Sequence, residues 1–177
     1  MSRSNPWKRK PRSTRHTTLI VVEGDTERAL VNYLKILCGR NCVTRVTIEN
    51  AHGGSGDGVL QLAIKLCSNA FDSCACLYDT DRAPTIKRFM DKARKLKIQE
   101  IPSAPCIEGL LLEILGEKVP SSSDECKRAM GLIVGSDSLT DCSTYEKYFS
   151  KNLFERRRLE VCQLNALLKL IKRNEKA

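Results

Sequence analysis

The chain has 177 residues, 41% of them hydrophobic, which is enough for one domain with a continuous core. No apolar run approaches the roughly 18 residues that a membrane-spanning helix needs, and the basic N-terminus lacks the apolar segment of a secretory signal. We therefore expect neither a membrane protein nor a secreted one, but a cytoplasmic protein without a membrane partner.

The formal charge of +9 is unevenly distributed. Residues 1–16 hold six bases and no acid, and residues 151–177 hold eight bases and three acids, which leaves −2 for residues 17–150. A nearly neutral body with basic ends indicates a polyanionic partner, namely nucleic acid. A solvated tail and a solvated helix face are the alternative. The bases predicted to contact nucleic acid are Lys8, Arg9, Lys10, Arg12, Arg156, Arg157 and Arg158.

Nine cysteines raise the question of disulfides. The count is odd, no secretory signal is seen, and Cys67, Cys74, Cys76 and Cys162 lie in apolar segments, so buried free thiols are favoured. Structural zinc is the weaker alternative, because the spacings are not those of the usual C-x2-C pairs.

Four short runs, apolar or alternating and rich in β-branched residues, predict strands. The first, "HTTLIVV", is continuously apolar after its first residues, which is typical of a strand buried in a parallel sheet. The predicted strands cover residues 16–22, 42–50, 73–81 and 98–102.

Helical spacing follows each of these strands. Leu30, Leu34 and Leu37 recur at helical intervals, and Gly39 is expected to end that helix. Further helices are predicted over residues 59–67, from Pro84 to Leu96, and over 106–115.

A glycine-rich loop, "HGGSGDG" at 52–58, precedes the second helix. Its glycines would let backbone N–H groups approach a phosphate, but the Gly-Lys-Ser/Thr ending of a Walker loop is absent. We therefore favour a connector, with His52 at the surface.

The strand and helix order predicts an α/β fold in which a parallel sheet has helices on both faces. In the last helix Val161, Leu164, Leu168 and Ile171 share one face, so this helix is expected to pack back on the core. The predicted organisation is a basic disordered tail at 1–15, an α/β core at 16–115, and a helical cap with a C-terminal helix at 116–177.

Acidic residues follow two of the predicted strands. Glu23 ends the first strand, and Asp79 and Asp81 end the third, where an i, i+2 spacing in an extended segment places both carboxylates on one side. Active groups of open parallel sheets gather at the carboxyl ends of the strands. Crowded carboxylates repel one another unless a hard cation neutralises them, so we expect Mg²⁺, with Mn²⁺ as the alternative.

Four further residues extend this acidic site. Glu108 falls in the first turn of the helix after the fourth strand, whereas Glu113 lies about 140° around the same helix. Gly24 is expected to let the backbone turn sharply. Glu27 either supports the site or only satisfies the helix dipole. Arg82 either stabilises phosphate charge or is an ordinary surface arginine.

These segments resemble a known family. "VVEGDTE" followed by "LYDTD" looks like the TOPRIM pattern, a strand-end glutamate followed further along the chain by an Asp-x-Asp pair. "IPSAPCIEGLLLEIL" is similar to the Asn-Pro-Cys-Phe-Glu-Leu-type segment of RloB-like proteins, small TOPRIM proteins linked to bacterial defence loci. The likeness covers residues 17 to about 115. It implies a TOPRIM fold and Mg²⁺-dependent phosphodiester chemistry with Glu23, Asp79, Asp81 and Glu108 as the motif acids.

The sequence thus predicts a metal-dependent nuclease, and family analogy favours RNA, tRNA included, as the substrate, with a role in antiphage defence. A toxic nuclease needs a restraining or activating partner protein. A binding module for nucleic acid or nucleotides with a regulatory metal site is the alternative, and a different Mg²⁺ phosphotransfer enzyme is a third class. Whether the chain forms a homo-oligomer stays open.

Overall fold

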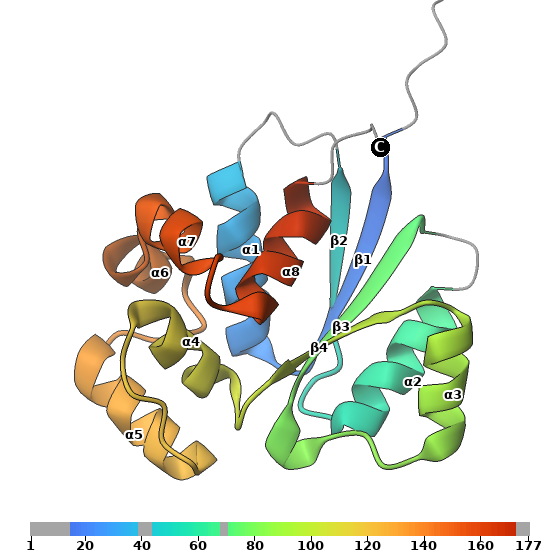
Figure 1. Ribbon diagram of the computed structural model, residues 1–177, viewed down its shortest axis with the longest axis horizontal. Helices are drawn as coiled ribbons and strands as arrows, with labels where there is room; N and C mark the ends of the chain where they lie inside the picture. Colours follow the sequence, from blue (N-terminus) through green and yellow to red (C-terminus); the bar gives the residue numbers. More distant parts are fainter. Residues whose placement is uncertain (1–14, 39–43, 68–70, 173–177) are drawn as a thin grey trace, which may run out of the picture.

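The computed structural model describes residues 15–38, 44–67 and 71–172. Its four strands form one parallel sheet in the order β2-β1-β3-β4, with the carboxyl ends of the strands toward the bottom of Figure 1. The predicted parallel α/β fold is confirmed. The strands are β1 (Thr17–Val22), β2 (Arg45–Asn50), β3 (Ser73–Asp79) and β4 (Gln99–Ser103).

Helices cover both faces of the sheet (Figure 1). Side chains alternate along each strand, so Ile20 and Val22 of β1 enter one apolar cluster while Leu19 and Val21 enter the other. The first cluster is closed by α1 (Asp25–Cys38), α4 (Ile107–Leu115) and α8 (Cys162–Lys172), and the second by α2 (Gly56–Leu66) and α3 (Lys87–Lys95).

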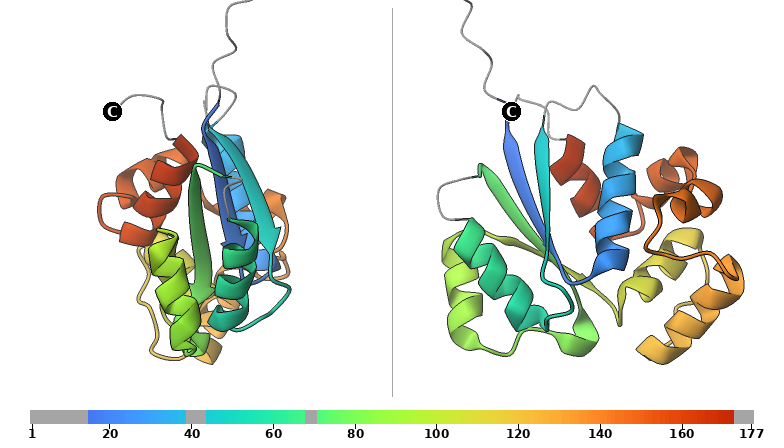
Figure 2. Two further views of the ribbon diagram at one scale, coloured as in Figure 1. Left: turned by 90° about the vertical axis from the view of Figure 1, so that its right-hand side faces the viewer. Right: turned by 180° about the vertical axis from the view of Figure 1, so that it is seen from behind.

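Three more helices extend the first face: α5 (Ser123–Val134), α6 (Cys142–Tyr148) and α7 (Lys151–Arg157). They lie beside α1 and α4, on the side away from α2 (Figure 2). Rings from α1, α6, α7 and the α6–α7 junction pack with centroids 5.5–6.1 Å apart. These rings belong to Tyr33, Tyr145, Phe149 and Phe154.

The predicted apolar face of the last helix is confirmed, because its four residues are buried in the first cluster, one directly before α8 and three within it. The segment before it forms a separate short helix, α7. These four residues are Val161, Leu164, Leu168 and Ile171.

Several predicted boundaries are wrong, and one of them is the start of α3, which lies at Lys87 and not at Pro84. β3 ends at Asp79, and residues 80–82 form a 3-10 turn, because the Asp81 N–H turns to donate to the carbonyl of Pro105 at 3.1 Å. α2 begins at Gly56, inside the predicted glycine-rich loop, where the Gly58 N–H already donates to the Ser55 carbonyl.

The prediction for the cysteines is partly wrong. Cys67, which follows α2, forms a disulfide with Cys74 of β3, since the fold brings their Cα atoms to 6.2 Å. Cys162 is exposed, whereas Cys76 is a buried free thiol.

Some predictions fall on residues that lie outside the described part of the chain. These include Gly39 and the basic tail with Lys8, Arg9, Lys10 and Arg12. Among the helices of the described segments, none combines the length and apolar character needed to cross a bilayer.

Candidate functional site

The acidic site lies between the carboxyl ends of β1 and β3. The chain leaves β1 for β2 on one side and then returns to β3 on the other, and ligands of such sheets bind at this point of reversal. The Glu23 N–H donates to the Leu77 carbonyl at 3.1 Å, and its carboxylate accepts the Asp79 N–H at 3.0 Å. Glu23 thus joins the ends of the two central strands.

Asp79 is held within the site as the last residue of β3. Its Oδ1 atom is buried and has no hydrogen-bond partner among the described residues. Burial raises its pKa to about 8, and neighbouring negative charges contribute to the same shift. In decreasing order, these charges belong to Glu27, Glu23, Asp81 and Glu108.

Glu27 is buried beside the other acids, which favours the first of the two roles left open by the sequence. It is only 4% exposed in the first turn of α1. Burial raises its pKa to about 7, and the charges of Glu23 and Glu108 add to the increase. A carboxyl group with this pKa exchanges a proton near neutral pH.

Gly24 provides space for Glu27 rather than a special turn. Its φ is not among the positive values, so the predicted sharp turn is not what requires glycine. A Cβ atom at position 24 would lie 3.1 Å from the Glu27 Oε2 atom. A side chain there would therefore press on the buried carboxylate.

Glu108 reaches the site from α4. It is half-buried in the first helical turn, and its Oε2 atom is buried without a hydrogen-bond partner in the described part of the chain. A Cβ atom on Gly109 would lie 2.7 Å from the Ala104 carbonyl oxygen. Glycine at 109 therefore lets the β4–α4 loop lie against α4, and this close contact sets the position of the Glu108 backbone.

Asp81 is placed differently from the prediction. It is exposed on the 3-10 turn, so the same-side argument for an extended segment does not apply to it. Its charge still raises the pKa values of Asp79 and Glu23, which keeps it near the site. Its carboxylate accepts a hydrogen bond from the Ser123 hydroxyl at the start of α5.

Ser123 was missed by the sequence reasoning. It lies in "SSSDE", where Ser122 caps α5 by accepting the Glu125 N–H. The run of serines followed by acids indicates the start of a helix. Nothing in this run indicates that the start of the helix contacts Asp81, which is far away in the sequence.

Arg82 provides positive charge at the same edge. Burial raises the pKa of Glu23, while the Asp79 N–H and the Arg82 charge lower it and Asp81 raises it further. The guanidinium is exposed and therefore able to meet a ligand from solvent.

The glycine-rich loop is tied to the site's backbone. The Gly53 N–H donates to the Glu23 carbonyl at 2.8 Å, and the His52 N–H donates to the Asn50 side chain at 2.7 Å. These two N–H groups are therefore already bonded, which favours the connector interpretation.

Two of the three C-terminal arginines are engaged in internal contacts. Arg157 donates to the Glu113 carbonyl at 2.6 Å and pairs with Glu160. Arg158, directly after α7, donates to the Asn165 side chain at 3.1 Å and pairs with Glu155 of α7. Of the three, only Arg156 is exposed, so this cluster offers little free positive charge for the predicted contact with nucleic acid.

The donor set fits a hard cation by chemistry, although its side chains are not arranged as a finished site. Within 15–38, 44–67 and 71–172, no three or more His, Cys, Asp or Glu side chains lie in position to hold a metal ion. The charges of Glu27, Glu23, Asp81 and Glu108 nevertheless all raise the pKa of Asp79, as expected for carboxylates near one another. Asp81 is bonded to Ser123 instead, and the unpaired oxygens of Asp79 and Glu108 are the atoms a cation would satisfy.

No protein-family model, no curated protein and no solved structure matches the chain. The TOPRIM and RloB-like resemblance therefore stays a prediction from short motifs.

Proposed function

We propose that the protein is a metal-dependent nuclease that hydrolyses phosphodiester bonds in nucleic acid. One observation supports this most strongly: Glu23, Asp79 and Glu108 come from three separate segments at the carboxyl edge of the sheet, Glu23 accepts the Asp79 N–H, and one buried oxygen each of Asp79 and Glu108 is unpaired among the described residues. Buried, uncompensated negative charge destabilises a fold, and such groups cluster where a ligand or a reaction requires them.

Mg²⁺ or Mn²⁺ would be held by Asp79 and Glu108, with Glu23 and Asp81 completing the oxygen donors. When bound, such a cation polarises a phosphate and lowers the pKa of a bound water molecule. Glu27, whose pKa is about 7, is suited to take up or release a proton at neutral pH. Arg82 offers its exposed charge to a phosphate oxygen.

The substrate class rests on the family resemblance. The resemblance to small TOPRIM defence proteins favours RNA, including tRNA, and a role in bacterial antiphage defence. The same resemblance suggests a partner protein that restrains or triggers the activity.

The first test is a cleavage assay of the full chain with total RNA, tRNA, single-stranded DNA and duplex DNA, in Mg²⁺, Mn²⁺ or EDTA. Asp79→Asn removes one charge while keeping the side-chain shape, and Glu117→Gln does the same at an exposed position after α4. We expect metal-dependent cleavage that Asp79→Asn abolishes and Glu117→Gln retains. Equal cleavage by both variants would contradict the assignment of the site.

A second readout is independent of activity. Mg²⁺ or Mn²⁺ should raise the melting temperature of the wild type and of Glu117→Gln, because a ligand of the native state stabilises it, but not that of Asp79→Asn. No shift in any of the three proteins would overturn the cation site.

The alternative is a module that binds nucleic acid or nucleotides and has a regulatory cation site. The hydrogen bond that ties Asp81 to Ser123, together with the open arrangement of the carboxylates, is the observation in its favour. A cation-dependent melting shift without cleavage of any of the four substrates would favour this alternative.

A further inference from the structure

The most basic segment of the described chain is α3 with its C-terminal turn. Residues 87–97 contain six bases and one acid, a net charge of +5, so the remainder of residues 17–150 is strongly acidic. All six bases are exposed. They are Lys87, Arg88, Lys92, Arg94, Lys95 and Lys97.

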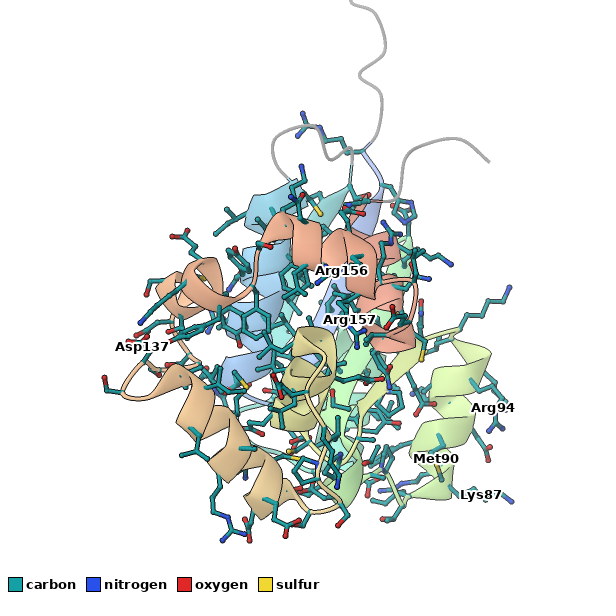
Figure 3. The ribbon with its side chains drawn as sticks, turned by 60° about the vertical axis from the view of Figure 1, so that its left-hand side comes forward. Lys87, Met90, Arg94, Asp137, Arg156 and Arg157 are labelled. Carbon is teal, nitrogen blue, oxygen red and sulfur yellow. A yellow bond between two sulfur atoms is a disulfide. The ribbon has the colours of Figure 1, made fainter. Side chains whose placement is uncertain are left out.

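The bases of α3 share one side of the helix. At 100° per residue they span an arc opposite to Ala93, which is completely buried against α2 and β3, and to the half-buried Phe89 and Met90. Figure 3 shows Lys87 and Arg94 extending from α3 away from the sheet. The one acid of the segment, Asp91, pairs with Arg94 at 3.2 Å in an exposed contact.

The start of α3 is held firmly by α2. The Asp57 carboxylate accepts the N–H groups of Thr85 and Ile86 and the Thr85 hydroxyl at 2.8–3.1 Å. A Cβ atom on Gly56 would lie 2.6 Å from the Pro84 ring, so the two segments are in close contact. The basic side of the helix is therefore presented in a fixed orientation.

The position of α3 links the acidic site to the opposite edge of the sheet. The helix begins shortly after Asp81, at the carboxyl edge, and runs back toward the start of β4 (Figure 1). There, two adjoining hollows of about 420 and 510 Å³ share Gln99 and Leu170 in their linings. Lys97 lines the first hollow, and Lys169 lines the second.

We propose that a nucleic-acid strand lies along α3, with its phosphates on the exposed bases of the helix and Lys97, and that this contact directs it to the carboxylates. The substrate class rests on the proposed function. The segment from 87 to 97 extends about 15 Å, which matches about four base steps of one strand. We call this set of six bases the α3 track.

The chemistry of the α3 track favours a phosphate backbone over other polyanions. Most of its apolar side packs against α2, and among the large apolar residues of this segment only Ile86 and Leu96, at its two ends, are exposed, which is little to enter a lipid surface. The Arg88 guanidinium lies 4.9 Å from the centre of the half-buried Phe89 ring, so this ring is not open for base stacking. Recognition here is electrostatic and independent of base sequence.

The test compares two triple variants with the same change of charge. Lys87→Gln/Lys92→Gln/Lys95→Gln removes three charges from the α3 track, and Lys127→Gln/Arg128→Gln/Lys151→Gln removes three exposed charges from α5 and α7. Affinity for a labelled single-stranded RNA is measured by fluorescence anisotropy in EDTA over a salt series, after unchanged melting temperatures show that both variants fold. Anionic lipid vesicles serve as a second probe.

We expect the α3 variant to bind RNA about tenfold or more weakly at low salt and to lose about 0.7 of log–log salt slope for each phosphate contact removed. The α5/α7 variant should change affinity less than about twofold. Equal losses in both variants, no loss in the α3 variant, or wild-type binding to vesicles but not RNA would overturn the track. The binding assay contains no metal, so it tests the α3 track independently of cleavage. If the α3 variant loses RNA affinity but the wild type shows no metal-dependent cleavage, the α3 track is supported and the nuclease is contradicted. If cleavage needs Asp79 but the α3 variant keeps the RNA affinity of the wild type, the nuclease is supported and the α3 track is contradicted.

Discussion

The two faces of the sheet are covered in different ways. On the face of α1, α4 and α8, the apolar cluster extends outward to α5, α6 and α7 and contains four packed aromatic rings. On the other face, α2 supplies most of the contacts, and Ala93 is the one fully buried residue that the described α3 contributes.

This difference separates stability from surface chemistry. A helix that buries little can change its exposed side chains at small cost, because surface substitutions away from caps and buried groups have small effects on stability. The first face contains the larger apolar cluster, whereas α3 is free to hold a dense positive charge. Between the two faces, the carboxyl ends of β1 and β3 hold the opposite charge.

The largest expected effect is in the aromatic cluster. Phe154→Ala should lower the free energy of unfolding by about 3–5 kcal/mol, because it leaves a cavity at a fully buried site. Phe89→Ala, at the half-buried position on α3, should cost about 1 kcal/mol. Urea unfolding followed by circular dichroism measures both. Similar losses would show that the two faces are equally important for stability.

The next effect concerns the charge between the faces. Because the pKa of Asp79 is raised in the fold to about 8, proton binding favours the native state, and stability is lost as pH rises from about 4 toward 8. Asp79→Asn should therefore stabilise the metal-free protein at pH 8 by about 2 kcal/mol once solvent screening is allowed for. The gain should shrink toward pH 4.

Urea unfolding in EDTA at several pH values measures this gain, with Glu117→Gln as the control of equal charge. A variant that is less stable than wild type at pH 8 would place Asp79 among the supporting residues of the fold instead.

The smallest effect concerns the anchor of α3. Partial burial raises the pKa of Asp57, but the hydrogen bonds from Ile86 and Thr85 lower it overall, so its stabilisation is present above pH 4 and is lost as pH falls. Asp57→Asn should cost about 1 kcal/mol near neutral pH. Hydrogen exchange should accelerate in α3 and stay unchanged in α8. Uniform acceleration would show that Asp57 supports the whole fold and not only one face.

Much of the fold could be predicted from local patterns. "LIVV" of β1 is continuously apolar, and the structure buries it on both sides in a parallel sheet. Glu108 was placed correctly in the first turn of its helix from Pro105 and the apolar run behind it. Hydrophobic periodicity and helix boundaries marked by proline depend on residues only a few positions apart, so the sequence shows them directly.

Other features depended on partners far away in the chain. Asp81 left the strand because its N–H met Pro105, and its carboxylate met Ser123. The Cys67–Cys74 disulfide depended on the approach of α2 to β3. The α3 track was hidden because its charge was averaged with the acids of the surrounding residues 17–150.

The sequence by itself determined the α/β class, the four strands and the acids at strand ends, because hydrophobic period and chain order set these features. Only the tertiary structure decided which acids interact, why Glu27 joins them and where free positive charge is presented. Burial and the distance between segments set the pKa of a carboxylate and the partners of an arginine, and neither quantity exists before the chain is folded.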